Sequence, residues 1–151
     1  MSNSVIYAAV MLAAGLGIPT MAAISGGLSG RLGSPVLATT VLLLVALSIT
    51  VATLLLTGGL RVPVPISSIP WYFFTGGAFA AFYMLGITWV APQFGVANAV
   101  AFVLLGQLIA MTIIDHVGFV GAPQSSVTWP RFFGLVLMTA GVILVVNPRL
   151  E

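Results

Sequence analysis

The sequence of 151 residues is 60% hydrophobic and 4% charged, and its four arginines and two acidic residues give a formal net charge of +2. Soluble domains carry about a quarter charged residues, so this composition excludes a soluble globular fold, and four arginines are too few for a nucleic-acid-binding patch. The sequence contains no cysteine, which excludes disulfides and thiol chemistry.

Long unbroken apolar runs predict helices that cross a lipid bilayer. About 20 apolar residues span the hydrocarbon core, and a helix satisfies its own backbone hydrogen bonds there. We therefore expect an all-α integral membrane protein with a single domain over residues 1–151 and no cofactor. The five expected transmembrane helices cover residues 4–25, 35–57, 71–91, 93–114 and 130–147. The first lacks the basic segment of a signal peptide, so we expect it to be retained.

The first expected helix is interrupted by Pro19. A proline kinks a membrane helix and frees a backbone carbonyl, here near Gly15. The kink serves either helix packing or a hinge beside a solute pathway. Residues 26–34 are rich in glycine and serine and predict a turn that carries Arg31.

The second expected helix begins at Pro35, because proline suits the first helical turn. Its hydroxylated side chains can bond back to the carbonyls of their own helix, so we interpret them as packing groups. They are Thr39, Thr40, Ser48, Thr50 and Thr53.

The third expected helix is bounded by Trp71 and Trp89, which are placed like interfacial aromatic residues. Tyr83 falls near its middle, where a phenol needs a hydrogen-bond partner, so we expect it to face other helices or a cavity. A tight turn over residues 91–95 predicts that the third and fourth helices form an antiparallel hairpin.

The fourth expected helix carries the amides Asn98 and Gln107. Gln107 lies on a four-residue stripe with Gly95, Ala99 and Val103, and a buried amide is unfavourable unless it is paired. Gln107 therefore contacts either a solute pathway or a neighbouring helix. Asn98 is a weaker pathway candidate near the opposite end.

Asp115 and His116 directly follow the fourth expected helix and begin a loop that we expect over residues 115–129. A helix C-terminus favours a cation, so Asp115 needs a partner, and Arg131 and Arg61 are the same-side candidates. Asp115 and His116, with such an arginine, form either an interfacial ion pair or a proton-responsive gate. No catalytic triad or metal ligand set is evident, and we expect no enzyme activity.

The arginines are evenly divided between the two sides of the expected topology. Arg61 and Arg131 lie on one side, and Arg31 and Arg149 lie on the other. The positive-inside rule therefore favours neither orientation. We interpret this balance as insertion in both orientations, with two copies pairing into an antiparallel dimer. Such a dimer recreates the inverted repeats of secondary transporters.

Four segments of the sequence carry a family resemblance. They are PWYFFTGG at residues 70–77, APQFG at 91–95, GQLIAMTIIDHVGFVG at 106–121 and WPRFFGLVLMTAGVILV at 129–145. These segments resemble the YdcZ-like family of the drug/metabolite transporter superfamily. The resemblance implies a five-helix bacterial inner-membrane transporter of small metabolites, with paired or dual-topology members. Two such chains, identical or paralogous, resemble the halves of a ten-helix transporter. Pro19 matches the family pattern, whereas Met21 and Ser25 stand where the family carries Gln and Asn.

Two functions follow as expectations. The first is transport of a small metabolite or drug-like solute by alternating access in a dimer, with Gln107, Asn98, Tyr83, Pro19 and Ser25 along the pathway. The alternative is a non-transporting assembly or regulatory subunit of the membrane. The sequence names no substrate, and a membrane-embedded acid in the first helix, which related four-helix exporters use for proton exchange, is absent here.

Overall fold

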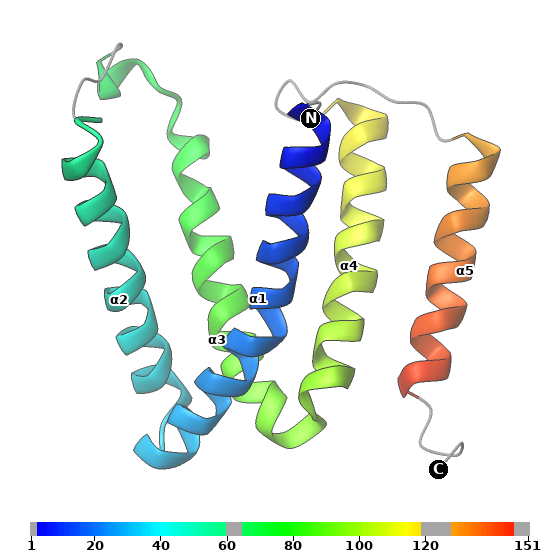
Figure 1. Cartoon of the computed structure of the whole chain (residues 1–151), viewed down its shortest axis with the longest axis horizontal. Helices are drawn as coiled ribbons and strands as arrows, with labels where there is room; N and C mark the ends of the chain where they lie inside the picture. Colours follow the sequence, from blue (N-terminus) through cyan, green and yellow to red (C-terminus); the bar gives the residue numbers. More distant parts are fainter. Residues whose placement is uncertain (1–2, 60–64, 119–127, 147–151) are drawn as a thin grey trace. The chain divides into compact units, whose positions relative to one another are not determined.

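The computed structural model describes residues 3–59, 65–118 and 128–146, and the described residues form helices joined by turns, with no β-strand among them (Figure 1). Its α-helices are α1 Asn3–Leu32, α2 Pro35–Leu56, α3 Gly76–Phe94, α4 Val96–Val117 and α5 Trp129–Val146. Two 3-10 helices, η1 Ile66–Ser68 and η2 Trp71–Thr75, lie between α2 and α3.

Within the described residues, four segments are long and apolar enough to cross a membrane: Ser4–Leu32, Pro35–Leu56, Trp71–Phe94 and Val96–Val117. A shorter apolar stretch, Phe132–Leu144, lies in α5. The expected all-α membrane class is thus confirmed, with four long helices and a shorter fifth. The chain divides into two compact units, Met1–Gln93 and Phe94–Glu151, which we describe separately.

In the first unit, α1 and α2 pack against each other and are joined by the two-residue turn Gly33–Ser34. Gly33 has φ of +65°, a left-handed conformation that glycine adopts without strain. The hydroxyl of Ser34 accepts a hydrogen bond of 3.3 Å from the Leu37 backbone N–H, which caps α2. Pro35 occupies the first turn of α2, as the sequence predicts.

The turn expected over residues 26–34 is wrong in extent, because α1 continues to Leu32. Glycine weakens a helix in water mainly through backbone entropy and solvent exposure. In an apolar environment the backbone has no competing partner, so glycine-rich sequence stays helical. Arg31 consequently lies in the last turn of α1, where its charge complements the helix dipole.

The turn expected over residues 91–95 is also shorter than predicted. Helix α3 includes Pro92 and ends at Phe94, so α4 starts at Val96 rather than at Gln93. A proline in the last turn removes only its own N–H donor to the carbonyl four residues earlier, which the helix end tolerates. The break falls at Gly95, whose φ of +88° no helix can contain.

Helix α4 ends at Val117 and is closed by Gly118 in the left-handed conformation, whose N–H donates to the Ile114 carbonyl at 2.9 Å. Asp115 and His116 therefore belong to the last turn of α4, and not to the following loop as expected. The second unit also contains α5, which packs against α4. The buried residues of α4 are Ala99 and Ala101.

The buried residues of the first unit are mostly small and lie on α1, α2 and α3. We call this set the α1–α2–α3 junction: Ala22, Ser25, Gly26 and Ser29 of α1, Ala38 and Thr39 of α2, and Ile87, Thr88 and Ala91 of α3. The four α1 members recur at three- and four-residue spacing and so share one helix face. Small side chains let helices approach closely in lipid, where packing rather than hydrophobicity drives association.

Gly26 of α1 lies close to Pro92 of α3. A Cβ atom placed on Gly26 would lie 3.0 Å from Cγ of Pro92. We expect Gly26→Val to force α1 away from α3 and to lower the free energy of unfolding by about 1–3 kcal/mol, as overpacking does. Reversible unfolding in mixed micelles measures this change.

Gly27 provides the matched control, because nothing lies within 4 Å of a Cβ at that position. Gly27→Val should leave the free energy of unfolding nearly unchanged. Equal destabilisation by the two variants would contradict the proposed close contact.

Candidate functional site

Gln107 lies near the middle of α4, and its side chain is exposed on the chain. Along the stripe that the sequence identified, Ala99 is buried, Val103 is half-buried and Gln107 is exposed. An amide facing hydrocarbon without a partner is costly, and polar groups within membrane helices face other helices or water. The position of Gln107 therefore requires cover from outside the second unit or from a water-filled path.

Asn98 has a local role in this structure. Its side-chain N–H donates to the Phe94 carbonyl at 2.9 Å, and its Nδ2 atom would lie 3.8 Å from a Cβ on Gly95. The amide thus spans the break before α4 and satisfies the Phe94 carbonyl, one of the acceptors that lack a partner at the end of α3. Gln93 acts similarly at the end of α3, donating to the Trp89 carbonyl at 3.1 Å.

Tyr83 and Ser25 lie in the first unit and differ in how their hydroxyls are satisfied. Tyr83 is half-buried, and its hydroxyl oxygen is buried without a hydrogen-bond partner within the described residues. Ser25 is fully buried, and its hydroxyl donates to the Ala22 carbonyl of its own helix at 3.1 Å. Ser25 therefore presents a satisfied hydroxyl to the junction, whereas the Tyr83 hydroxyl retains hydrogen-bonding capacity.

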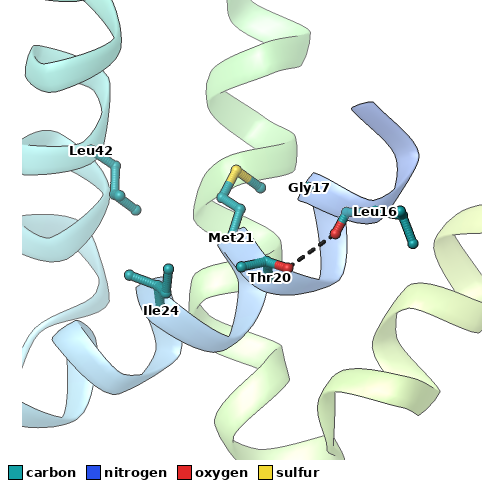
Figure 2. Close-up of a pocket in the computed structure, with 6 residues that line it drawn as sticks. All are labelled: Leu16, Gly17, Thr20, Met21, Ile24 and Leu42. Atoms are coloured by element: carbon teal, nitrogen blue, oxygen red, sulfur yellow. Dashed lines mark hydrogen bonds between the residues drawn. The ribbon is translucent and has the colours of Figure 1, made fainter. Parts of the chain in front are cut away.

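Pro19 lies inside α1, a helix that changes direction along its length (Figure 1). Beside it is an open groove of about 470 Å³ between α1 and α2 (Figure 2), lined by Leu16, Gly17, Thr20, Met21, Ile24 and Leu42. The hydroxyl of Thr20 bonds the Leu16 carbonyl at 3.0 Å, and the other lining side chains are apolar. The groove thus suits an acyl chain or another apolar group better than a polar solute.

A comparison with known protein families shows to which family the chain belongs. The family model described as "Putative inner membrane exporter, YdcZ" matches residues 6–144. The chain belongs to the YdcZ family. No curated protein and no solved structure matched the chain. The resemblance seen in the sequence is confirmed, and the chain is a multi-pass membrane protein of a family of transporters rather than enzymes.

In this YdcZ-family chain, the last turn of α4 holds Asp115, which is half-buried, and His116, which is exposed. The expected arginine partners, Arg61 and the Arg131 side chain, lie outside the described residues, so the Asp115–arginine pair stays a prediction. In the described part of the chain, no group of three or more His, Cys, Asp and Glu residues is placed to hold a metal ion.

Two residues that sequence reasoning missed are Thr39 and Thr88 of the junction. They are 1% and 0% exposed, and their hydroxyl oxygens have no hydrogen-bond partner among the described residues. The sequence grouped Thr39 with the self-bonding hydroxyls of α2 and did not single out Thr88. The one signal for Thr88 is Pro92, four residues later, which cannot donate to the Thr88 carbonyl.

The backbone break before α4 yields a testable prediction. Gly95 has φ of +88° and ψ of 141°, a combination that is strained for any residue with a Cβ. We expect Gly95→Ala to lower the free energy of unfolding by about 1–3 kcal/mol. Gly86→Ala is the control, because Gly86 is helical and has open space around it. Equal unfolding free energies for the two variants would exclude a strained turn at Gly95.

Proposed function

We propose that this chain exports small solutes through a pathway that forms between two copies and that Gln107 lines. The family assignment supports membrane transport in general. The proposal that Gln107 lines the pathway rests on the exposure of its amide near the middle of the apolar helix α4. An amide in that position is stable when it faces water or solute inside an assembly.

The exposed surface of the single chain supports a second copy. The α1–α2–α3 junction is small, and large apolar side chains remain exposed on each of the α-helices. Lipid covers apolar side chains well, but it leaves Gln107 without a hydrogen-bonding partner. A second chain supplies the additional helices that enclose a pathway around this amide.

An antiparallel arrangement of the two copies follows from the balanced arginines. With two arginines on each side of the expected topology, neither orientation is favoured during insertion. Oppositely inserted copies give two equivalent halves related by a two-fold axis in the membrane plane. That arrangement supports alternating access by rocking of one half against the other.

Replacement of Gln107 tests the pathway. We expect Gln107→Leu to reduce solute flux in proteoliposomes by about tenfold or more, because a hydrogen bond to the solute is lost. The free energy of unfolding should change by less than about 0.5 kcal/mol, since no buried partner is left unsatisfied. A metabolite screen by thermal stabilisation of the purified protein supplies the solute for the assay.

Gln93→Leu is the matched control, because the Gln93 amide bonds its own helix at the end of α3. It should retain flux. Unfolding or aggregation of Gln107→Leu would show that Gln107 joins helices instead of lining a pathway. Absence of flux for every stabilising solute in the wild-type protein would favour the alternative function, an assembly or regulatory subunit.

Added lysines test the antiparallel pairing. Gly30 and Leu32 are exposed in the last turn of α1, so Gly30→Lys with Leu32→Lys adds two cations beside Arg31. We expect reporters fused to the C-terminus to shift toward one orientation, because orientation follows the difference in cations between sides. The opposite shift is expected for Ile66→Lys with Ser67→Lys, in the exposed η1 segment. A single orientation that is the same in all three proteins would exclude dual insertion.

A further inference from the structure

One face of α1 carries an apolar groove and, further along, an arginine. Gly17, Ile24 and Arg31 are exposed and follow one another at seven-residue spacing, which is about two turns of helix. Residues two turns apart lie on nearly the same face of a helix. The buried α1 residues of the junction lie on the opposite face, so this stripe is left for a partner other than α3.

The groove is apolar and open. Its lining comes from α1, with Gly17 and Ile24 among the residues, and from Leu42 of α2 (Figure 2). The hydroxyl of Thr20 already donates to the Leu16 carbonyl at 3.0 Å, so the groove offers no unused donor to a polar solute. A hydrocarbon chain, which needs no hydrogen bond, suits this lining.

Arg31 supplies a positive charge at the end of the same face. It lies in the last turn of α1, at the end of the apolar segment Ser4–Leu32. A guanidinium is costly in hydrocarbon, so this turn belongs at the membrane surface. The two acidic residues of the chain, Asp115 and Glu151, both fall outside the first unit. The first unit therefore contains no carboxylate that could neutralise Arg31.

The distance between Arg31 and the groove matches one leaflet of a bilayer. Ile24 precedes Arg31 by 7 residues and Leu16 precedes it by 15. At the rise of an α-helix, these positions lie roughly 10 Å and 22 Å from Arg31 along the chain. One leaflet supplies half of the hydrocarbon core, or roughly 15 Å, and helix tilt brings residues closer to the surface. The groove thus lies at the depth of the distal part of an acyl chain whose phosphate is at Arg31.

We propose that α1 and α2 bind an anionic phospholipid, with its phosphate at Arg31 and one acyl chain in the groove. An arginine fork donates two hydrogen bonds to a phosphate, and a net negative headgroup matches the lone cation. A second copy of the chain is a poorer occupant, because it brings four arginines against two acidic residues. This lipid site is independent of the proposed export of a solute.

Lipids that differ in one property at a time test the site. Delipidated protein in detergent is given phosphatidylglycerol or phosphatidylcholine with the same palmitoyl and oleoyl chains, dihexanoyl phosphatidylglycerol, or inorganic phosphate. Native mass spectrometry measures the bound lipid, and heating measures the unfolding temperature. Long-chain phosphatidylglycerol should be retained most strongly and should raise the unfolding temperature most. Equal retention of the two long-chain lipids, or equal stabilisation by inorganic phosphate, would overturn the proposal.

Replacement of Arg31 tests the headgroup contact. We expect Arg31→Gln to weaken binding of phosphatidylglycerol about fivefold, as removal of one basic residue near an anionic membrane surface does. Binding of phosphatidylcholine should change less, so the preference between the two lipids should be lost. Arg31→Lys keeps the charge and should retain most of the preference. An undiminished preference for phosphatidylglycerol in Arg31→Gln would overturn the proposal.

Filling the groove tests the acyl-chain contact. Nothing lies within 4 Å of a Cβ at Gly17, so Gly17→Leu places a side chain in the groove without a clash. It should lower the retention of both long-chain lipids. Gly15→Leu is the matched control, because Gly15 is equally open and does not line the groove. Equal lipid retention in the two variants would overturn the proposal, as would a changed oligomeric state of Gly17→Leu with lipid retention intact, which would assign the groove to a second copy. Arg31→Gln, at an exposed helix end, decides the matter if Gly17→Leu does not fold.

Discussion

Hydrocarbon offers no hydrogen-bonding partner, so every polar group in this chain has to find one within the protein or in water that the protein admits. Most side chains meet this requirement locally. Exposed threonines bond the carbonyl of the preceding turn, and Ser34, Gln93 and Asn98 bond backbone groups at helix ends. These contacts explain how a chain with so few charges keeps defined helix boundaries. Among the described residues, the buried hydroxyls of Tyr83, Thr39 and Thr88 have no hydrogen-bond partner, and Gln107 is exposed near the middle of α4. These groups define the functional questions about this YdcZ-family protein.

The same environment explains why small residues occupy the α1–α2–α3 junction. Lipid and apolar side chains are equally hydrophobic, so helices gain little by burying leucine against leucine. They gain by close backbone approach, as Gly26 and Pro92 show. A junction of this kind separates with little loss of apolar burial. Its helices are therefore suited to move, which a transporter that alternates between two open states requires.

Sequence reasoning predicted the helical class, the start of α2 at Pro35 and the family, because each depends on composition or on a local motif. It misplaced the turns over residues 26–34 and 91–95, because glycine and proline break helices mainly in water or in helix interiors. It also could not separate Thr39 from Thr40, since both side chains have the same options on an isolated helix. Only the packing of α1, α2 and α3 distinguishes them. Whether the arginines pair with Asp115 depends on residues outside the described part of the chain.

The proposed function requires that Gln107 faces a water-accessible pathway instead of lipid. The chain contains no native cysteine, so Gln107→Cys and the control Ile109→Cys each carry a single thiol. Ile109 is 54% exposed on the same helix, and two residues along a helix point in different directions. The rate of modification by a charged, water-soluble thiol reagent in proteoliposomes is measured for both variants. A pathway that Gln107 lines predicts rapid labelling of Gln107→Cys and little labelling of Ile109→Cys. Two inert thiols, or two labelled at the same rate, would contradict it.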